Sequence, residues 1–328
     1  MLPTKPLLGV LADNLRRRQS VLPLSRRRAI GWANGLNIPM GGKTVIYTGL
    51  MYQLMPSILA LEKMTSRLED SPIRRLLGLG RMLNKVLSVS GFVGLWVSSK
   101  EQRIFDNILR NIACLLRTAD IDFGYLYGEE LYAGALVHDQ GICSAFEDHA
   151  YRVYERLKQH GVKRVITVDP HTTNTLRTVY PKIIRDYRLE VTSYLELLAE
   201  RNLQPTTRID ADAVIHDPCV YARYEGVVDE PRRLLTNAGV RALDPEYSAK
   251  MTFCCGGPIE SLFPSKARSI AETRVQQLAA KGSHVVTMCP ICFINLRAAA
   301  KVDGLSIEDI SFSLAEGYCD RNMDRSHG

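Results

Sequence analysis

Short apolar, β-branched segments recur along the chain and alternate with segments of helical pattern. A helical pattern from Pro231 to Ala238 begins with proline in its first turn, and another from Ser265 to Lys281 ends before Gly282. Alternation of strands with helices predicts an α/β fold with parallel sheets. The clearest predicted strands, each read as buried on both faces, are 44–47, 164–168, 213–216 and 284–288.

The chain also repeats itself. Segment 164–177 (RVITVDPHTTNTLR) aligns with 284–297 (HVVTMCPICFINLR) at a constant offset of 120 residues. Segment 45–50 lies over 214–219, and segment 130–134 (ELYAG) is placed over the segment that ends at Gly256. We therefore expect two related Rossmann-like domains with parallel sheets, forming a pseudo-twofold internal repeat.

The repeat suggests a division of the chain into three parts. Residues 1–40 form a basic N-terminal arm with two runs of three arginines, residues 41–204 the first domain and residues 205–328 the second. The first domain is longer because of an insertion at about 66–104 that has both basic and apolar parts. A helical flap packed on its own domain and a docking surface for a partner subunit or membrane both fit this insertion.

Five of the eight cysteines are gathered between residues 219 and 292, at three separate places. The first is followed by 34 residues and an adjacent pair, then by 33 residues and a CxxC pair. Three-point spacing of this kind argues against buried cysteines that act only as small hydrophobes. Zinc needs four ligands, so a zinc site using four thiolates stays open, whereas a fifth thiolate suggests a larger iron–sulfur assembly. The five are Cys219, Cys254, Cys255, Cys289 and Cys292.

This pattern, with its local sequences HDPC, CCGGP and CPIC, resembles the cysteine-rich CCG domain. That domain occurs in the B subunit of heterodisulfide reductases and in related iron–sulfur subunits of glycolate, lactate and succinate oxidoreductases. The resemblance covers residues 42–328 and is strong in the second domain. It implies one non-cubane [4Fe-4S] cluster held by all five cysteines. The first domain is a degenerate CCG domain, whose cysteine positions are occupied by Leu50, Tyr132, Ala133, Asp169 and Thr172.

Several residues beside the cysteines suit the same chemistry. Gly256 and Gly257 let the backbone approach a cluster and offer N–H donors, and Pro290 suits the first turn of the helix that follows Cys289. His216 is read either as a donor to a cluster sulfur or as an ordinary histidine at a strand end. No catalytic residue is assigned.

Other polar and sulfur-bearing positions receive more ordinary interpretations. Asp169 and His171 stand at the vacated CxxC position, where hydrogen-bonded filling is favoured over a pocket for a substrate acid or thiol. The remaining cysteines have no matching partners and are read as core or surface thiols: Cys114, Cys143 and Cys319.

The composition of the chain indicates its cellular compartment and the kinds of partner that suit it. An apolar fraction of 46% in 328 residues supports the cores of two domains, and eight cysteines without a secretory signal favour a reducing compartment. The net charge of +7 fits an acidic partner, an anionic membrane surface or an anionic substrate, but the basic runs lack the interleaved aromatic residues of a nucleic-acid site. No apolar run reaches the ~18 residues of a spanning helix. We expect a cytoplasmic protein, with peripheral membrane attachment through a partner left open.

The resemblance implies an oxidoreductase subunit that is active only within a complex. We expect a component like the B subunit in a heterodisulfide reductase-like complex of sulfur metabolism, exchanging electrons with a thiol or disulfide. The implied partners are a flavoprotein subunit, a ferredoxin-like [4Fe-4S] subunit, a second B-type subunit and a lipoate-carrying protein. An electron-transfer subunit of an organic-acid oxidoreductase and a zinc-bound structural subunit are the alternatives.

Overall fold

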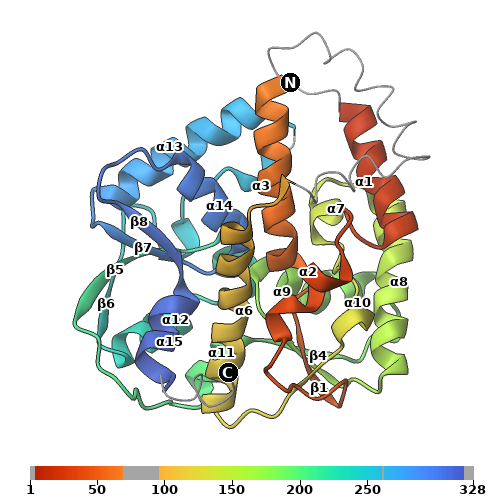
Figure 1. Ribbon diagram of the computed structural model, residues 1–328, viewed down its shortest axis with the longest axis horizontal. Coiled ribbons are helices and arrows are strands. Elements are labelled where there is room, and N and C mark those ends of the chain that lie inside the picture. The colour runs from red at the N-terminus through yellow and green to blue at the C-terminus, as the bar shows by residue number, and fades with distance from the viewer. Residues whose placement is uncertain (1–3, 69–95, 261, 321–328) are drawn as a thin grey trace.

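The computed structural model describes residues 4–68, 96–260 and 262–320. These residues form two four-stranded parallel sheets with helices packed around them, so the predicted α/β class is confirmed (Figure 1). The first sheet has the order β2-β1-β3-β4 and the second the order β6-β5-β7-β8. Each sheet places its strands in the same relative order, since β2, β1, β3 and β4 correspond to β6, β5, β7 and β8. This confirms the two Rossmann-like halves.

The first sheet pairs β1 with β3 through Val45 and Val165, which are fully buried. Its strands are β1 (Thr44–Tyr47), β2 (Gly124–Tyr125), β3 (Arg164–Thr167) and β4 (Glu190–Ser193). The helices of this half are α1 (Thr4–Arg18), α2 (Arg26–Ile30), α3 (Met51–Leu68), α6 (Ser99–Thr118), α7 (Ala135–Asp139), α8 (Cys143–Gln159), α9 (Pro170–Asn174), α10 (Tyr180–Ile183) and α11 (Tyr194–Glu200). Shorter helical turns are η1 (Gly31–Ala33), η4 (Tyr127–Glu129) and the π-helix η5 (Thr175–Val179).

The second sheet pairs β5 with β7 through Val214 and Val285. Its strands are β5 (Ala211–His216), β6 (Val240–Leu243), β7 (His284–Thr287) and β8 (Ser306–Asp309). Its helices are α12 (Asp229–Asn237), α13 (Pro264–Ala279), α14 (Pro290–Ala299) and α15 (Ile310–Tyr318), with the π-helix η6 (Tyr221–Glu225) and the short turns η7 (Ala249–Met251) and η8 (Gly257–Ile259).

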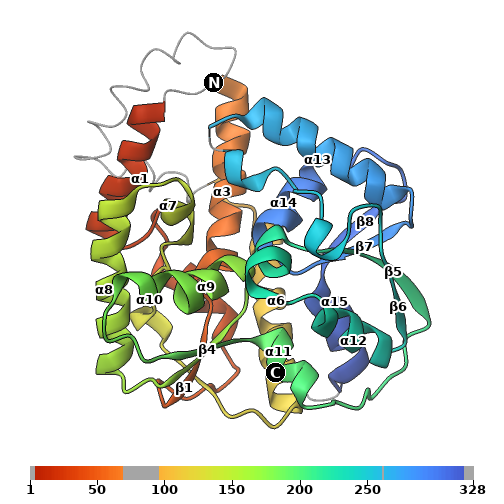
Figure 2. The ribbon, with the colours of Figure 1, turned by 180° about the vertical axis from the view of Figure 1, so that it is seen from behind.

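The two halves meet through equivalent elements. Helix α14 contacts α3, while its counterpart α9 contacts η6, and the pair α15 and α6 mirrors the pair α11 and α12. Helices α3 and α6 run between the two sheets in both views (Figures 1 and 2). This reciprocal packing brings the carboxyl ends of both sheets toward the shared interface, where sites in parallel sheets form.

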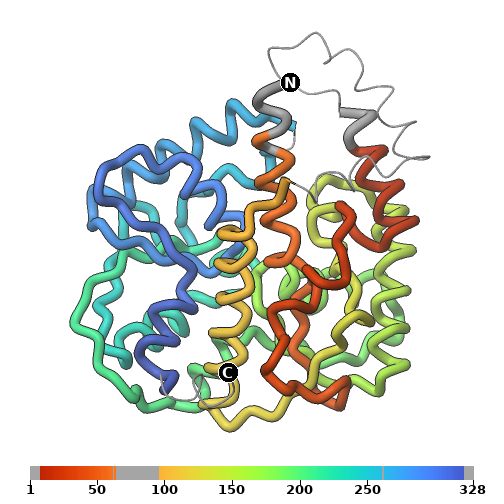
Figure 3. Tube along the Cα trace, viewed as in Figure 1, coloured from red at the N-terminus to blue at the C-terminus, as the bar shows by residue number. Residues whose placement is uncertain are grey.

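The strand and helix predictions agree closely with the structure. Strands β1 and β7 begin at Thr44 and His284 as expected, and helices α12 and α13 each lie within two residues of their predicted bounds. The predicted insertion at 66–104 lies mostly outside the described residues. The N-terminal segment packs on the first half, where α1 contacts α8 (Figure 3). Buried Trp32 donates to the Tyr125 hydroxyl at 3.3 Å.

Candidate iron–sulfur site

Two adjacent strands of the second sheet end at cysteines. Cys219 follows β5 and Cys289 follows β7, where it caps α14. Because β5 and β7 pair in parallel, their carboxyl ends lie side by side. Pro290 begins α14 as predicted and places Cys292 in its first turn, near the free N–H groups of the helix start.

The sulfurs of all five predicted cysteines form one connected group. Hydrogen-bonding contacts run from Cys219 to Cys254, from Cys254 to Cys255, from Cys255 to Cys292 and from Cys292 to Cys289. Three of the five are buried and the other two half-buried. Five thiols in mutual contact cannot all ionise without a cation between them, so the donor set fits a soft, positively charged metal assembly.

The loop that carries the adjacent pair depends on its two glycines. Gly256 has a φ of 83°, and a Cβ there would lie 2.4 Å from the Ala267 carbonyl oxygen. Its backbone N–H donates to Cys254 Sγ at 3.3 Å. A Cβ on Gly257 would lie 2.3 Å from Ile291 Cγ2 and 3.4 Å from Cys255 Sγ. Neither position therefore has room for a side chain, because the loop packs closely against α13 and α14.

His216 lies at the end of β5 and faces the cysteines. One of its ring nitrogens is within 4.8 Å of the sulfurs of Cys255 and Cys292. Nδ1 accepts a hydrogen bond from Arg274 Nε at 3.1 Å, and an arginine side chain can only donate. Nε2 must then carry the proton of the neutral ring, and it has no hydrogen-bond partner among the described residues. Burial, with a smaller contribution from Arg274, lowers the pKa of His216 to about 3, which keeps this neutral form.

The corresponding place in the first half is built from described residues and holds no cysteine. Gly134 has a φ of 89°, close to that of Gly256, which supports the alignment of the two loops. A Cβ on Gly49 would lie 2.2 Å from Thr172 Oγ1 and 3.1 Å from Ala133 Cβ. Asp169 caps α9 by accepting from Thr172 N at 2.9 Å. Side chains occupy this position, but only part of their polar atoms are hydrogen-bonded: among the described residues, Asp169 Oδ2 and Thr172 Oγ1 have no partner.

His171 was assigned to the vacated site, but it also reaches the other half of the molecule. Its Nδ1 lies 2.9 Å from Asp139 Oδ2, and the sulfur of Cys289 is near enough to interact with its charge. Burial opposes a charge on this ring, but the interactions with Asp139 and Cys289 outweigh it and raise the pKa of His171 well above its ordinary value. No local pattern indicates this proximity, because the two residues are 118 positions apart, in different halves of the molecule.

Two of the remaining cysteines were interpreted wrongly. Cys114 on α6 and Cys319 after α15 form a disulfide, with Cα atoms 6.3 Å apart. Packing of α6 against α15 brings them together. Cys143 is an exposed thiol, as one of the two interpretations expected.

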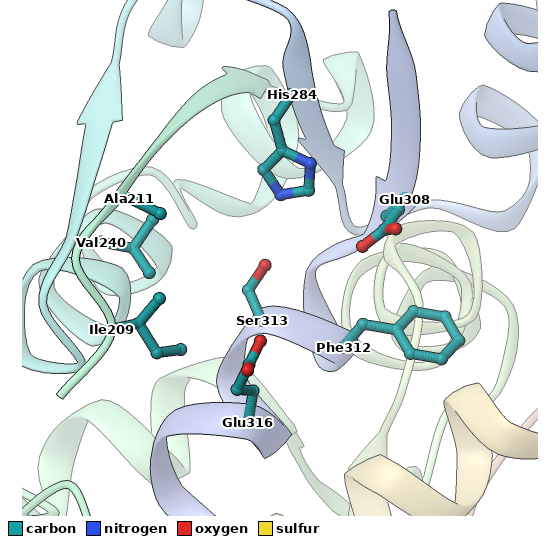
Figure 4. Close-up of a pocket in the computed structure, with 8 residues that line it drawn as sticks. All are labelled: Ile209, Ala211, Val240, His284, Glu308, Phe312, Ser313 and Glu316. Atoms are coloured by element: carbon teal, nitrogen blue, oxygen red, sulfur yellow. The ribbon is translucent and has the colours of Figure 1, made fainter. Parts of the chain in front are cut away.

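A cavity lies elsewhere on the second half, beyond the amino-terminal parts of its strands (Figure 4). It has a volume of about 430 Å³ and is lined partly by His284, Glu308, Phe312 and Glu316. The cysteines are not among its lining residues. Among the helices of the described residues, none is both long and apolar enough to cross a membrane.

Residues 213–297, which hold all five cysteines, match the cysteine-rich CCG domain family, and this confirms the resemblance seen in the sequence. The chain is 29% identical over 216 residues to an EtfAB:quinone oxidoreductase of Syntrophomonas wolfei, covering 62% of this chain and 30% of that protein. It is also 29% identical over 218 residues to a probable iron–sulfur-binding oxidoreductase of Bacillus subtilis, covering 63% and 30%.

A third relative is the D subunit of a dihydromethanophenazine:CoB–CoM heterodisulfide reductase of Methanosarcina mazei. Its identity to this chain is 27% over 219 residues, or 62% of this chain and 53% of that relative. The chain thus spans about a third of the length of the first two relatives and about half of the third.

Proposed function

We propose that this chain is the iron–sulfur subunit of a heterodisulfide reductase-like oxidoreductase. The observation that carries the proposal is the single connected group of five cysteine sulfurs at the carboxyl edge of the second sheet. The five would hold one [4Fe-4S] cluster of the non-cubane type, which supplies one-electron transfer when bound. Oxidoreductases among the relatives support this class of activity.

The surrounding residues suit such a group. The second sheet and α14 position Cys219, Cys289 and Cys292, and the glycine loop positions the adjacent pair. His216 would donate its Nε2–H to a sulfur, because Arg274 occupies its other nitrogen. Arg274, fully buried, adds a positive charge next to the anionic sulfurs.

The substrate in this proposal is a thiol or disulfide of sulfur metabolism. Reduction of a disulfide takes two electrons and two protons and releases two thiols, whereas this chain holds one complete cysteine set. A partner must therefore carry the second electron. A flavoprotein subunit and a ferredoxin-like [4Fe-4S] subunit fit that need, with a second B-type subunit and a lipoate-carrying protein as further partners in a cytoplasmic complex.

The names of other relatives favour a second candidate. An EtfAB:quinone oxidoreductase and the B subunit of a fumarate reductase (CoM/CoB) match parts of the chain as well. Under this alternative the chain passes electrons between partners and binds no sulfur substrate. An EPR signal that changes when a thiol or disulfide is added supports the first candidate, and an unchanged signal supports the second.

Metal and sulfide analysis of anaerobically purified protein tests the cluster itself. We expect about four irons and four sulfides per chain, a brown colour and an EPR signal, all lost in Cys255→Ala. Cys143→Ala is the matched control, because Cys143 is exposed and lies outside the group of five. About one zinc without sulfide would instead indicate a structural site, and about eight irons would mean that the first half binds a cluster too.

A further inference from the structure

Apolar side chains gather at one exposed place on the second half. Among the described residues, seven large apolar side chains are exposed, and three of them belong to two short segments, 221–225 and 247–253. Tyr224 is 70% exposed, Met251 72% and Tyr247 48%. We call these three residues the apolar patch. Contiguous exposed apolar residues mark interaction sites, whereas single scattered ones need no explanation.

The two segments are bound to each other, so the apolar patch is one surface. The Arg223 guanidinium donates to the carbonyl of Lys250 at 3.2 Å and to that of Thr252 at 2.5 Å. The turn η7 contacts the π-helix η6, and the rings of Tyr247 and Phe253 lie 6.5 Å apart. These contacts fix both segments, and a partner would therefore meet a pre-formed surface.

The same two segments adjoin the two least buried cysteines of the group of five. Cys219 comes two residues before η6, and Cys254 directly follows Phe253. Both are half-buried, whereas the other three cysteines are at most 3% exposed. Thr252 Oγ1 donates to the Asp217 carbonyl at 2.8 Å, which joins the two segments just ahead of their cysteines. An electron carrier that approaches the site from its less buried side therefore arrives at the apolar patch.

The charges around the apolar patch are mostly positive. On η6, on residues 246–253 and in the first two turns of α13, exposed cations outnumber exposed carboxylates by four to one. Helix α13 belongs to this surrounding because its start packs against the cysteine loop. An apolar centre with a cationic rim is complementary to a partner that presents carboxylates around an apolar centre. The cations are Arg223, Lys250, Lys266 and Arg268, and the carboxylate is that of Glu246.

We propose that the apolar patch and its cationic rim are the docking surface for an electron-carrier protein with an acidic face. One electron passes between this carrier and the cluster held by the adjacent cysteines, so that one partner is oxidised as the other is reduced. The inference rests on the proposed function, but only on its cluster, and it holds whether or not the chain also binds a sulfur substrate.

Electron exchange between cluster-loaded protein and a small acidic ferredoxin tests this inference, followed by stopped-flow absorbance in the direction that the two potentials allow. Exchange with a viologen dye is measured on every variant, because the dye is small and needs no docking surface. We expect the double variant Tyr224→Ser with Met251→Ser to react with the ferredoxin about tenfold more slowly than the wild type. Met40→Ser is the matched control, because Met40 is 54% exposed but pairs with Tyr125 of the first sheet.

A change of charge gives a second test that keeps the apolar side chains. Lys250→Glu should slow the reaction at low salt, and its difference from the wild type should shrink as salt is added, because the Debye length falls from about 30 Å at ~0.01 M to about 8 Å at ~0.15 M. Lys281→Glu, an exposed position ahead of β7 at the opposite edge of the sheet, should react like the wild type. Carbodiimide cross-linking, mapped by mass spectrometry, should join Lys250 to a carboxylate of the ferredoxin.

The possible failures are distinguishable. Loaded protein that exchanges electrons with the dye but not with the ferredoxin overturns this inference alone, and so do equal ferredoxin rates in the wild type and both patch variants. Cross-links confined to lysines outside the cationic rim also overturn it. Wild-type protein without iron and sulfide overturns the proposed function and this inference with it.

Discussion

The hydroxyl of Tyr52, in the first half, donates a 2.7 Å hydrogen bond to Asp309 at the end of the last strand of the second half. The relationship is reciprocal, because Tyr221 of the second half makes a 2.9 Å bond to Ser193 at the end of the last strand of the first. Each tyrosine follows the first strand of its own sheet. The two hydrogen bonds connect the halves of the molecule close to the cysteines.

Removal of the Tyr52 hydroxyl should weaken this junction more than removal of its counterpart. Tyr52→Phe leaves buried Asp309 without one of its donors, and we expect a loss of about 1–3 kcal/mol in the free energy of unfolding. Tyr221→Phe removes bonds to the neutral hydroxyls of Ser193 and Thr173, and we expect about 1 kcal/mol. Chemical denaturation of both variants provides the measurement. Equal losses would show that the charge of Asp309 does not matter here.

Arg274 should support the cluster electrostatically. It is fully buried and bonds to His216, the Glu246 carbonyl and Gln277, and no ion pair with a carboxylate is found for it within the described part of the chain. A buried cation needs an anion, and Asp217 and then the sulfurs of Cys292 and Cys255 are near enough to attract it.

The substitution Arg274→Met keeps most of the side-chain length and removes the charge. We expect a lower reduction potential and a lower cluster content than in the wild type. Arg268→Met is the control, because Arg268 lies on the same helix but is exposed. If both variants kept the wild-type potential, Arg274 would have a purely structural role.

His149 should make the fold sensitive to mild acid. Its Nε2 lies 2.6 Å from the Tyr132 carbonyl, and burial lowers its pKa from 6.5 to about 4. The unfolded chain therefore binds a proton that the folded chain does not, and stability is lost as the pH falls from 6.5 to 4, by about 3 kcal/mol when complete.

The pH dependence of unfolding between 6.5 and 5 measures this effect. His149→Gln should flatten the curve relative to the wild type, whereas His160→Gln, one residue beyond the same helix, should not. Parallel curves for the wild type and His149→Gln would assign the acid sensitivity to other groups.

The disulfide between Cys114 and Cys319 should appear in thiol counting. In oxidised, cluster-loaded protein, Cys143 is the exposed thiol and should react first with a soluble thiol reagent.

Cys114→Ser with Cys319→Ser should lower the free energy of unfolding by up to about 5 kcal/mol, because the bond closes a loop of 205 residues. Cys143→Ser serves as the control. An unchanged stability would mean that the pair remains reduced, as a reducing compartment favours.

Repeated patterns made the strands and the five cysteines predictable. The 120-residue offset located β3 and β7 together, and local motifs placed Cys289 and Pro290 at the start of α14. Edge strands such as β2, with two residues, have too little sequence to show a period. The sequence did not predict the Cys114–Cys319 bond or the proximity of His171 to Cys289. Both depend on how the two halves pack together, and the spacing of residues along the chain does not reveal that packing.

The disulfide also turns much of the chain into a covalent ring. All five clustered cysteines lie between positions 114 and 319, so the ring encloses every proposed cluster ligand and both strands that present them. A single backbone cut inside the ring would open it without releasing a fragment. The ligand-bearing part of the oxidised chain would then survive limited proteolysis as one molecule and separate only on reduction.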